Sequence, residues 1–541
     1  MILNDPPTTM PSQPITTPRS ESLARIALPS ATIGALLFAL AGAASRPAWF
    51  DELFTLRLAR LSFRGILAAL ENDSGPPLHY FLVHSIWLAI RWAEGSHQEI
   101  LFARLPSVLA FTCLPLLLAR FGSANRRFFP WGSLIAVSWL PMLYFGTEAR
   151  SYAILALVNA VLWTLGPRWI ERGRRGTVGF ALVAATLPLT HNTGVLYLGA
   201  LFLLPVFLPA PLRVRSLSAT AAAGLPFLFF LPMMLHQPVA SVEWMNFPGA
   251  DGRAGLATVE VLSAGGPFPS LFELSKSPIP PALSVTALAA VFAALLAGLI
   301  RLAKDRSDVG RRDFALAIRL LAGTSPAFAM AVASGFGAPV YFAGRTEMAA
   351  WPLFAAAVGV AATTLDAQTR TLLLAPFVVA GLATETVWLS HLPERLPSTG
   401  IQAAEHIAPS LQPGDRIVAA GLWELELRYG LARVDSANPG RPFPRPEFQT
   451  FPASLASHPG WLDFEKASSP AHLEEARTLR HQCEALGCRR IWLVWSPSLA
   501  LSESFFPAFS GWKQFKVFRN QVIAVDLLVN PVPGSPVEER R

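Results

Sequence analysis

The fold is decided by stretches such as residues 281–306, which read PALSVTALAAVFAALLAGLIRLAKDR. Residues 281–300 carry no charged side chain, and Arg301, Lys304 and Arg306 follow at once. A helix rises about 1.5 Å per residue, so a run of this length crosses the roughly 30 Å of hydrocarbon in a bilayer. We therefore expect a membrane-spanning helix that ends in a basic loop.

The composition of the whole chain agrees with this reading. The 541 residues are 52% hydrophobic and 15% charged, with a mean hydropathy of +0.41, whereas about 25% of residues are charged in soluble domains. This excludes an ordinary soluble enzyme and a disordered chain. The net charge of +8 comes from arginines at the ends of apolar runs, so we assign it to membrane topology and expect no nucleic-acid partner.

Apolar runs recur along the first 391 residues and then stop. The loops between them alternate in charge, and by the positive-inside rule the basic loops belong in the cytoplasm. This predicts a polytopic α-helical membrane protein of the inner or plasma membrane with a cytoplasmic N-terminus. The eleven expected spans cover residues 26–44, 100–119, 130–146, 151–167, 177–190, 192–209, 216–235, 281–300, 314–336, 346–364 and 371–391.

One apolar segment, Pro77–Trp92, breaks this alternation if it crosses the membrane. We therefore expect it to lie on the outer surface, with His84, Trp87 and Arg91 sharing a face toward the lipid headgroups. The sequence leaves open whether it spans instead. In domain terms, a disordered cytosolic tail (1–25) precedes a transmembrane domain (26–392), whose first outer loop is residues 45–99.

Residues 393–530 lie outside the membrane in this topology and are followed by a flexible end, 531–541. Their pattern predicts a small extracytoplasmic α/β domain. We expect helices at 401–411 and 471–486, and strands at 416–420, 490–495 and 522–528. Three cysteines exclude a disulfide framework and a zinc cluster. Cys483 and Cys488 either pair in an oxidising compartment or stay reduced.

Several ionisable residues lie at the outer ends of the expected spans rather than in the basic loops. Each has an ordinary explanation, such as an acid at a helix N-terminus or a charged side chain reaching water. Together they bring carboxylates and cations to one face, which suits transfer chemistry on a lipid-linked anion: arginines hold a phosphate and a carboxylate accepts a proton. The residues are Asp51, Glu52, Asp73, Glu148, Arg150, His191 and Arg345.

At these positions the chain resembles the polytopic glycosyltransferases of the GT-C class. These include the dolichyl-phosphate-mannose protein mannosyltransferases of glycosyltransferase family 39 and the lipid A aminoarabinose transferases. The resemblance extends over residues 26–391. Its motifs are Trp49-Phe50-Asp51-Glu52, Asp73 through Pro76-Pro77-Leu78-His79-Tyr80, Ala103-Arg104-Leu105-Pro106-Ser107, Tyr144 through Glu148-Ala149-Arg150-Ser151-Tyr152, Thr190-His191-Asn192, and Gly344-Arg345 with Pro352.

The resemblance implies an inverting transferase in which Asp51, with Glu52 beside it, is the catalytic acid pair. It further implies that Arg150, Arg345 and His191 contact the donor phosphate. Supporting roles fall to Asp73, Glu148, Tyr152 and Arg104. No metal-ligand spacing is present, so we expect no obligatory metal and no cofactor, and the sequence leaves open whether a metal ion assists.

These observations predict a hexosyl- or pentosyltransferase that moves one sugar from a polyprenyl-phosphate donor to an extracytoplasmic protein, lipid or glycan. A transporter or lipid flippase, and a glycan polymerase or ligase with a polyprenyl-diphosphate donor, remain as alternatives. The sequence names neither the sugar nor the acceptor. We expect the outer loop at 236–280, with Glu243 and Trp244, to carry that information.

Overall fold

The computed structural model describes most of the chain between residues 18 and 531, and 74% of it is helical. Asp73, Glu243 and Trp244, which the sequence analysis named, lie outside the described residues. Within that range the segments not described are 72–74, 92–96, 124–130, 237–258, 260, 264–278, 337, 339, 342–343, 393–397, 420, 439–442, 454–470, 498–500 and 521–522.

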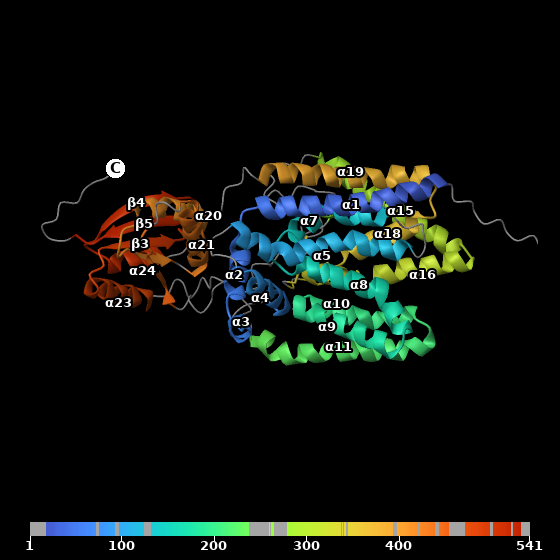
Figure 1. Ribbon diagram of the computed structural model, residues 1–541, viewed down its shortest axis with the longest axis horizontal. Helices are drawn as coiled ribbons and strands as arrows, with labels where there is room; N and C mark the ends of the chain where they lie inside the picture. Colours follow the sequence, from blue (N-terminus) through green and yellow to red (C-terminus); the bar gives the residue numbers. More distant parts are fainter. Residues whose placement is uncertain are drawn as a thin grey trace, which may run out of the picture.

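The larger part of the molecule is a bundle of helices that run side by side (Figure 1). The longest described helices are apolar over most of their length, which is the pattern of a protein that contacts lipid on its outer side. The bundle consists of α1 (Pro18–Ser45), α5 (His97–Ser123), α6 (Trp131–Val137), α7 (Leu140–Gly146), α8 (Tyr152–Glu171), α9 (Arg174–Thr190), α10 (Gly194–Ala200), η1 (Leu201–Phe207), α11 (Ala210–His236), α15 (Pro281–Lys304), α16 (Asp308–Ala322), α17 (Ser325–Gly335), α18 (Trp351–Ala362) and α19 (Ala367–His391).

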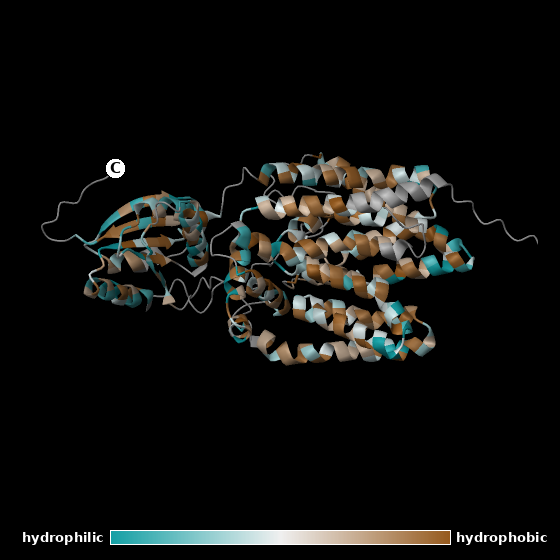
Figure 2. Ribbon diagram, in the orientation of Figure 1, coloured by the Kyte–Doolittle hydropathy of each residue, from teal (hydrophilic) through white to brown (hydrophobic). Residues whose placement is uncertain are grey.

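Among the described residues, five helices are long and apolar enough to cross a membrane, or up to seven if each sharply bent pair counts as one span. Figure 2 shows the apolar residues along the bundle. Each of the eleven expected spans has helical residues, but two of them are broken, between α6 and α7 and between α16 and α17, where Pro141 and Pro326 lie in the first turn of the second helix. A third span changes without a break from α10 to the 3-10 helix η1, which contains Pro205. The count of eleven stays a prediction.

Three short helices gather at the end of the bundle that faces the C-terminal domain: α2 (Phe50–Ala59), α3 (Phe63–Leu70) and α4 (Leu78–Ile90) (Figure 1). The segment expected to lie on the membrane surface corresponds to α4. Its polar face was predicted wrongly, because His84 is buried and its Nδ1 lies 2.8 Å from the Ala59 carbonyl oxygen. His84 therefore ties α4 to α2 instead of contacting headgroups, while Arg91 stacks on Trp87 at 4.6 Å.

The C-terminal domain is a five-stranded sheet of order β2-β1-β3-β5-β4. The strands β2, β1 and β3 run parallel, and β5 is antiparallel to both β3 and β4. One apolar core lies between the sheet and α23 with α24, and a second lies between the sheet and α20 with α21. The elements are α20 (Thr399–Ile407), η3 (Ala408–Ser410), β1 (Arg416–Ala419), α21 (Gly421–Ala437), β2 (Glu447–Thr450), α23 (Ala471–Ala485), β3 (Arg490–Trp495), α24 (Leu501–Ala508), β4 (Lys513–Arg519) and β5 (Ala524–Val529).

All five elements predicted from the sequence in this domain are present, within a few residues. The structure also contains α21, α24, β2 and β4, which the sequence pattern does not predict. The burial of β2 and β4 explains the omission of these strands, since both are edge strands with mostly exposed or half-buried residues. Such strands carry little of the alternating apolar pattern on which strand prediction depends.

Candidate functional site

The candidate site begins where the chain turns from α1 into α2, with an angle of 90° between the two helices. Pro47 follows the last turn of α1 and cannot extend its hydrogen-bond pattern. Arg104 of α5 donates hydrogen bonds to the carbonyl groups at this helix end: to the oxygens of Ala43 at 2.6 Å, Arg46 at 2.8 Å and Pro47 at 3.1 Å. Arg104 therefore holds the turn that presents the first residues of α2.

Glu52 is the anionic partner of Arg104. Its two carboxylate oxygens accept from Arg104 Nε at 2.8 Å and Nη2 at 2.6 Å, so all five N–H groups of Arg104 are used. Both side chains are fully buried. Glu52 also accepts from the Ala149 N–H at 2.8 Å. A planar bidentate pair of this kind is rigid, and Glu52 therefore fixes α2 against α5 and the segment that precedes α8.

That segment, residues 147–151, is attached at three further points. Thr55 donates to the Ala149 carbonyl oxygen at 3.2 Å, and Ser107 donates to the Arg150 carbonyl oxygen at 2.6 Å. Arg46 donates to the Glu148 carboxylate at 2.7 Å and to the Tyr144 carbonyl oxygen at 3.1 Å. With its backbone held on both sides, the segment presents the side chain of Arg150 toward α2.

Asp51 and Arg150 meet at the accessible part of this network. Asp51 Oδ2 lies 3.6 Å from Arg150 Nη2, and the two side chains are 16% and 20% exposed. A distance of 3.6 Å exceeds that of a hydrogen bond, so this ion pair is looser than the one between Glu52 and Arg104. Of the two neighbouring acids, Asp51 is thus the one that a ligand can reach.

Arg345 approaches the same place from the turn before α18. Its guanidinium lies over the rings of Trp49, Phe145 and Tyr152, at 5.4–5.6 Å from the ring centroids. It is close enough to Asp51, Glu148 and Arg150 to interact with their charges. The cations Arg150 and Arg345 and the carboxylate of Asp51 therefore lie close together, although they come from three separate parts of the chain.

The turn that carries Arg345 is held by Glu347. One oxygen of Glu347 accepts from the Gly344 N–H at 2.7 Å, and the other accepts from the Tyr341 hydroxyl. Tyr197 donates to the Thr346 carbonyl oxygen at 3.2 Å. Gly344 has φ +86°, a conformation in which glycine is favoured. Glu347 therefore positions Arg345 and is itself buried.

His191 completes the cluster from the connection between α9 and α10. Its ring lies 5.1 Å from that of Tyr152, and its Nδ1 is 2.9 Å from the Thr193 hydroxyl. Both Arg150 and Arg345 are within electrostatic range of the imidazole. His191 thus borders the cationic side of the site.

The structure brings together all but one of the site residues named from the sequence, since Asp73 lies outside the described part of the chain. It divides the others into two groups: Asp51, Arg150, Arg345 and His191 are half-buried, whereas Glu52, Arg104, Glu148 and Tyr152 are buried. Arg46 and Glu347 were missed. An arginine at the outer end of the first span runs against the positive-inside rule, and that signal marks Arg46 in the sequence.

A cavity of about 330 Å³ lies on the other side of α2, between the bundle and α21 of the C-terminal domain. Its polar groups are two ion pairs, Arg60 with Glu99 and Arg428 with Glu424, together with Arg57. Among the described residues, no carboxylate lies within ion-pair distance of Arg57. The cavity therefore carries a net positive charge beside apolar walls formed by leucines of α2 and α21.

The convergent charges can hold an anion and accept a proton within the same opening. In the part of the chain that the structure describes, no three His, Cys, Asp or Glu residues are placed to share a metal ion. The geometry therefore describes a site of two arginines, a histidine and a carboxylate at one end of a bundle of apolar helices.

No protein-family model matches the chain, and no curated protein matches it in sequence. Two crystal structures of ArnT from Cupriavidus metallidurans align with 92% of this chain and 97% of the ArnT chain. The apo structure is 15% identical with a TM-score of 0.45, and the structure bound to undecaprenyl phosphate is 14% identical with a TM-score of 0.44. ArnT is a lipid A aminoarabinose transferase of the GT-C class, the class that the sequence motifs resemble. A likeness of this degree carries no argument about substrate.

Proposed function

We propose that the protein is a membrane glycosyltransferase that transfers a sugar from a polyprenyl-phosphate carrier to an acceptor hydroxyl outside the cytoplasm, with inversion at the anomeric carbon. One observation carries the proposal: Asp51 lies 3.6 Å from Arg150, with Arg345 beside them, in the accessible part of a network that is otherwise buried. A phosphate needs cations and an attacking hydroxyl needs a base, and this opening supplies both.

The reaction is a single displacement. The acceptor hydroxyl oxygen forms a bond to the anomeric carbon while the bond from that carbon to the phosphate oxygen breaks. Asp51 accepts the hydroxyl proton, a step that contributes roughly 10²–10⁴-fold in rate. The polyprenyl phosphate leaves with the bonding electron pair and gains one negative charge.

Arg150 and Arg345 stabilise that developing charge. Both guanidiniums are held before substrate arrives, Arg150 through its docked backbone and Arg345 through its turn and its aromatic neighbours. Donors that are already oriented cost no reorganisation during the reaction, which is the basis of electrostatic catalysis. His191 adds a further hydrogen-bonding group toward the phosphate.

Glu52 takes a different role from the one that its sequence position suggested. Its carboxylate is fully buried and is occupied by Arg104 and the Ala149 N–H. An acid in that state is not accessible to a substrate hydroxyl. Glu52 is a positioning residue that sets the direction of Asp51, and Asp51 is the sole base of the mechanism.

The acceptor binds on the side of α2 that faces the C-terminal domain. The cavity there offers a cation, Arg57, next to apolar walls, which suits an amphipathic acceptor with an anionic group. Replacement Arg57→Ala is expected to raise the KM for the acceptor several-fold while the KM for the donor stays unchanged. Both KM values, measured in the same membranes, check this expectation. An unchanged KM for the acceptor would show that the acceptor does not bind in the cavity.

The proposal as a whole is tested with purified protein in liposomes and radiolabelled donors. Transfer from polyprenyl-phosphate sugar, and not from polyprenyl-diphosphate glycan, is the expected result. Transfer from the diphosphate alone would identify a polymerase or ligase. Movement of labelled lipid between leaflets with no sugar transfer would identify a transporter or flippase instead.

A further inference from the structure

The C-terminal end of α23 has a conformation that brings two cysteines together. The helix ends with the sequence Cys483-Glu-Ala-Leu-Gly-Cys488, in which Gly487 has φ +68°. The Cys488 N–H donates to the Cys483 carbonyl oxygen at 2.8 Å. This six-to-one bond across a left-handed glycine is the Schellman motif, in which the side chains of the first and last residues pack against each other.

Both thiols lie in the same apolar core of the C-terminal domain. Cys483 is fully buried and Cys488 is 8% exposed. Their interaction with each other lowers the pKa of Cys488, and the same interaction together with burial raises the pKa of Cys483. Arg416 Nη1 lies 3.5 Å from Cys483 Sγ and favours a thiolate there.

We propose that Cys483 and Cys488 are joined by a disulfide bond in the membrane-inserted protein. The inference rests on one part of the proposed function, the position of the C-terminal domain outside the cytoplasm, where disulfides form and persist. It does not depend on sugar transfer. The bond links the end of α23 to the residues that lead into β3. It therefore holds α23 against the sheet at this end of the helix.

The bond forms by thiol–disulfide exchange with an oxidant protein that carries a disulfide. The Cys488 thiolate attacks one sulfur of the oxidant, which releases the other as a thiolate. The Cys483 thiolate then attacks Cys488 and releases the second. The two protons of the cysteines pass to the two oxidant thiolates, so the oxidant is reduced by the two electrons that Cys483 and Cys488 lose. Since both thiols are buried in the folded domain, the exchange takes place before that core has closed.

The third cysteine supplies an internal control. Cys113 lies on α5 in the bundle, is exposed, and has neither of the other cysteines near it in the sequence. It is expected to remain a thiol in the same molecules. Trypsin, which cleaves after arginine, releases residues 481–489 as one peptide that contains both Cys483 and Cys488.

The test uses the full-length protein in its native membrane. The sample is quenched with acid, unfolded, alkylated, digested and measured by mass spectrometry, with and without prior reduction. Without reduction, peptide 481–489 is expected to be unalkylated and lighter by two hydrogen atoms, while Cys113 is alkylated. After reduction, the peptide is expected to carry two alkyl groups.

Two alkyl groups on peptide 481–489 before reduction would overturn the proposal. An impermeant label on a cysteine introduced at Lys513 of the same domain separates this failure from a failure of the topology. If that site is labelled from outside and the pair is reduced, the disulfide alone is wrong. If that site is shielded, the domain is cytoplasmic, and the sidedness shared with the proposed function is wrong as well.

Discussion

Asp51 and Glu52 are adjacent carboxylates with opposite surroundings. Residues next to each other on a helix project about 100° apart, so Glu52 points into the bundle toward Arg104 while Asp51 faces Arg150 at the opening. Substitution of either acid is expected to reduce activity, but for different reasons, and the two reasons can be measured separately.

For Asp51→Asn, we expect turnover to fall by roughly 10²–10⁴-fold with folding intact, because the amide keeps the shape and loses the base. For Glu52→Gln, we expect loss of folded protein, since Arg104 is left as a buried charge without its counterion. Breaking such a pair costs about 3–5 kcal/mol. Turnover per folded molecule and thermal unfolding of both variants check this. Full activity of Asp51→Asn would remove the base from the mechanism.

Arg345 provides a second test at the scale of one residue. Arg345→Lys keeps the charge but loses the planar fork that binds two phosphate oxygens and stacks on Trp49 and Tyr152. We expect the KM for the donor to rise and kcat to fall by about tenfold or more, and Arg345→Ala to have a larger effect. Arg57→Lys, on the opposite side of α2, is the control with unchanged donor kinetics. If Arg345→Ala left the donor KM and kcat unchanged, Arg345 would have no role in donor binding or in catalysis.

At the scale of the elements, α20 and α21 are joined by a buried acid. Glu426 on α21 accepts from the Gly400 N–H at the start of α20, at 2.9 Å. The helices are in close contact, since a Cβ on Gly400 would lie 2.4 Å from the Glu426 Cβ. Burial raises the pKa of Glu426 from its usual 4.5 to about 7.

This shift makes the stability of the C-terminal domain depend on pH. Between pH 4.5 and 7 the folded state holds a proton that the unfolded state has lost, so the free energy of unfolding falls as pH rises through that window. The change is at most about 3 kcal/mol. Glu426→Gln keeps the hydrogen-bond acceptor and is expected to abolish the dependence. Hydrogen exchange of residues 399–437, corrected for the intrinsic effect of pH, measures it in the full chain.

An equal pH dependence in the Gln variant would show that another group titrates. Glu424, on the same helix, is the matched control. It is paired with Arg428 beside the cavity next to α2, and Glu424→Gln is expected to leave the pH dependence in place.

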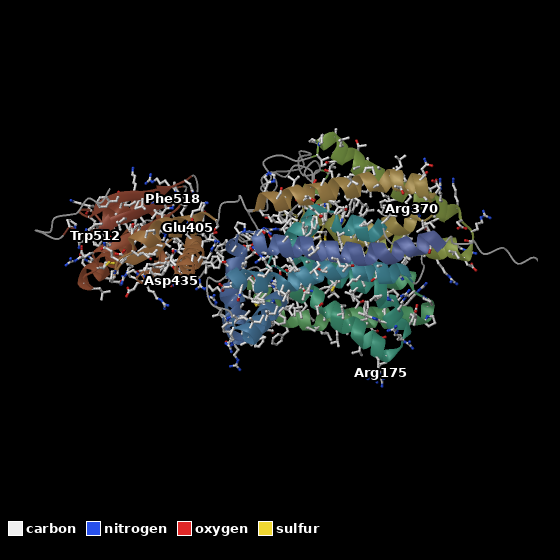
Figure 3. All side chains as sticks on the ribbon, turned by 45° about the horizontal axis from the view of Figure 1, so that its top comes forward. Arg175, Arg370, Glu405, Asp435, Trp512 and Phe518 are labelled. Carbon is white, nitrogen blue, oxygen red and sulfur yellow. The ribbon has the colours of Figure 1, made fainter. Side chains whose placement is uncertain are left out.

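At the scale of the whole molecule, the charges separate along the long axis. Figure 3 places Arg175 and Arg370 on the half of the bundle away from the C-terminal domain, whereas α2 and the candidate site lie at the end toward it (Figure 1). This separation agrees with basic loops in the cytoplasm and a site outside it.

Single cysteines in a protein without its native ones test this topology. We expect Arg306→Cys, in the loop between α15 and α16, to be shielded from an impermeant thiol reagent in intact cells and Lys513→Cys to be labelled. Both native residues are exposed. Gly310 is a poorer position, since a Cβ there would lie 2.3 Å from Asp305. Labelling of Arg306→Cys from outside would contradict the predicted sidedness of the basic loops, and with it the position of the site outside the cytoplasm.

The apolar helices, the basic loops and half of the elements of the C-terminal domain could be predicted from the sequence alone. These features depend on residues within a few positions of one another, because helical and strand periodicity and the hydropathy of a span are local properties. The motifs also located Asp51, Arg150, His191 and Arg345 before any contact between them was known.

Which of these groups are exposed follows from contacts between residues far apart in the sequence. The pairs that bury Glu52 with Arg104 and Glu148 with Arg46 join residues 52 and 102 positions apart in sequence. Long-range pairing of this kind has no local periodicity, and for that reason the accessible acid and the cavity beside α2 became visible only in the folded chain. The sequence left open whether Cys483 and Cys488 pair, and the left-handed Gly487 between them brings their backbones together in the folded chain.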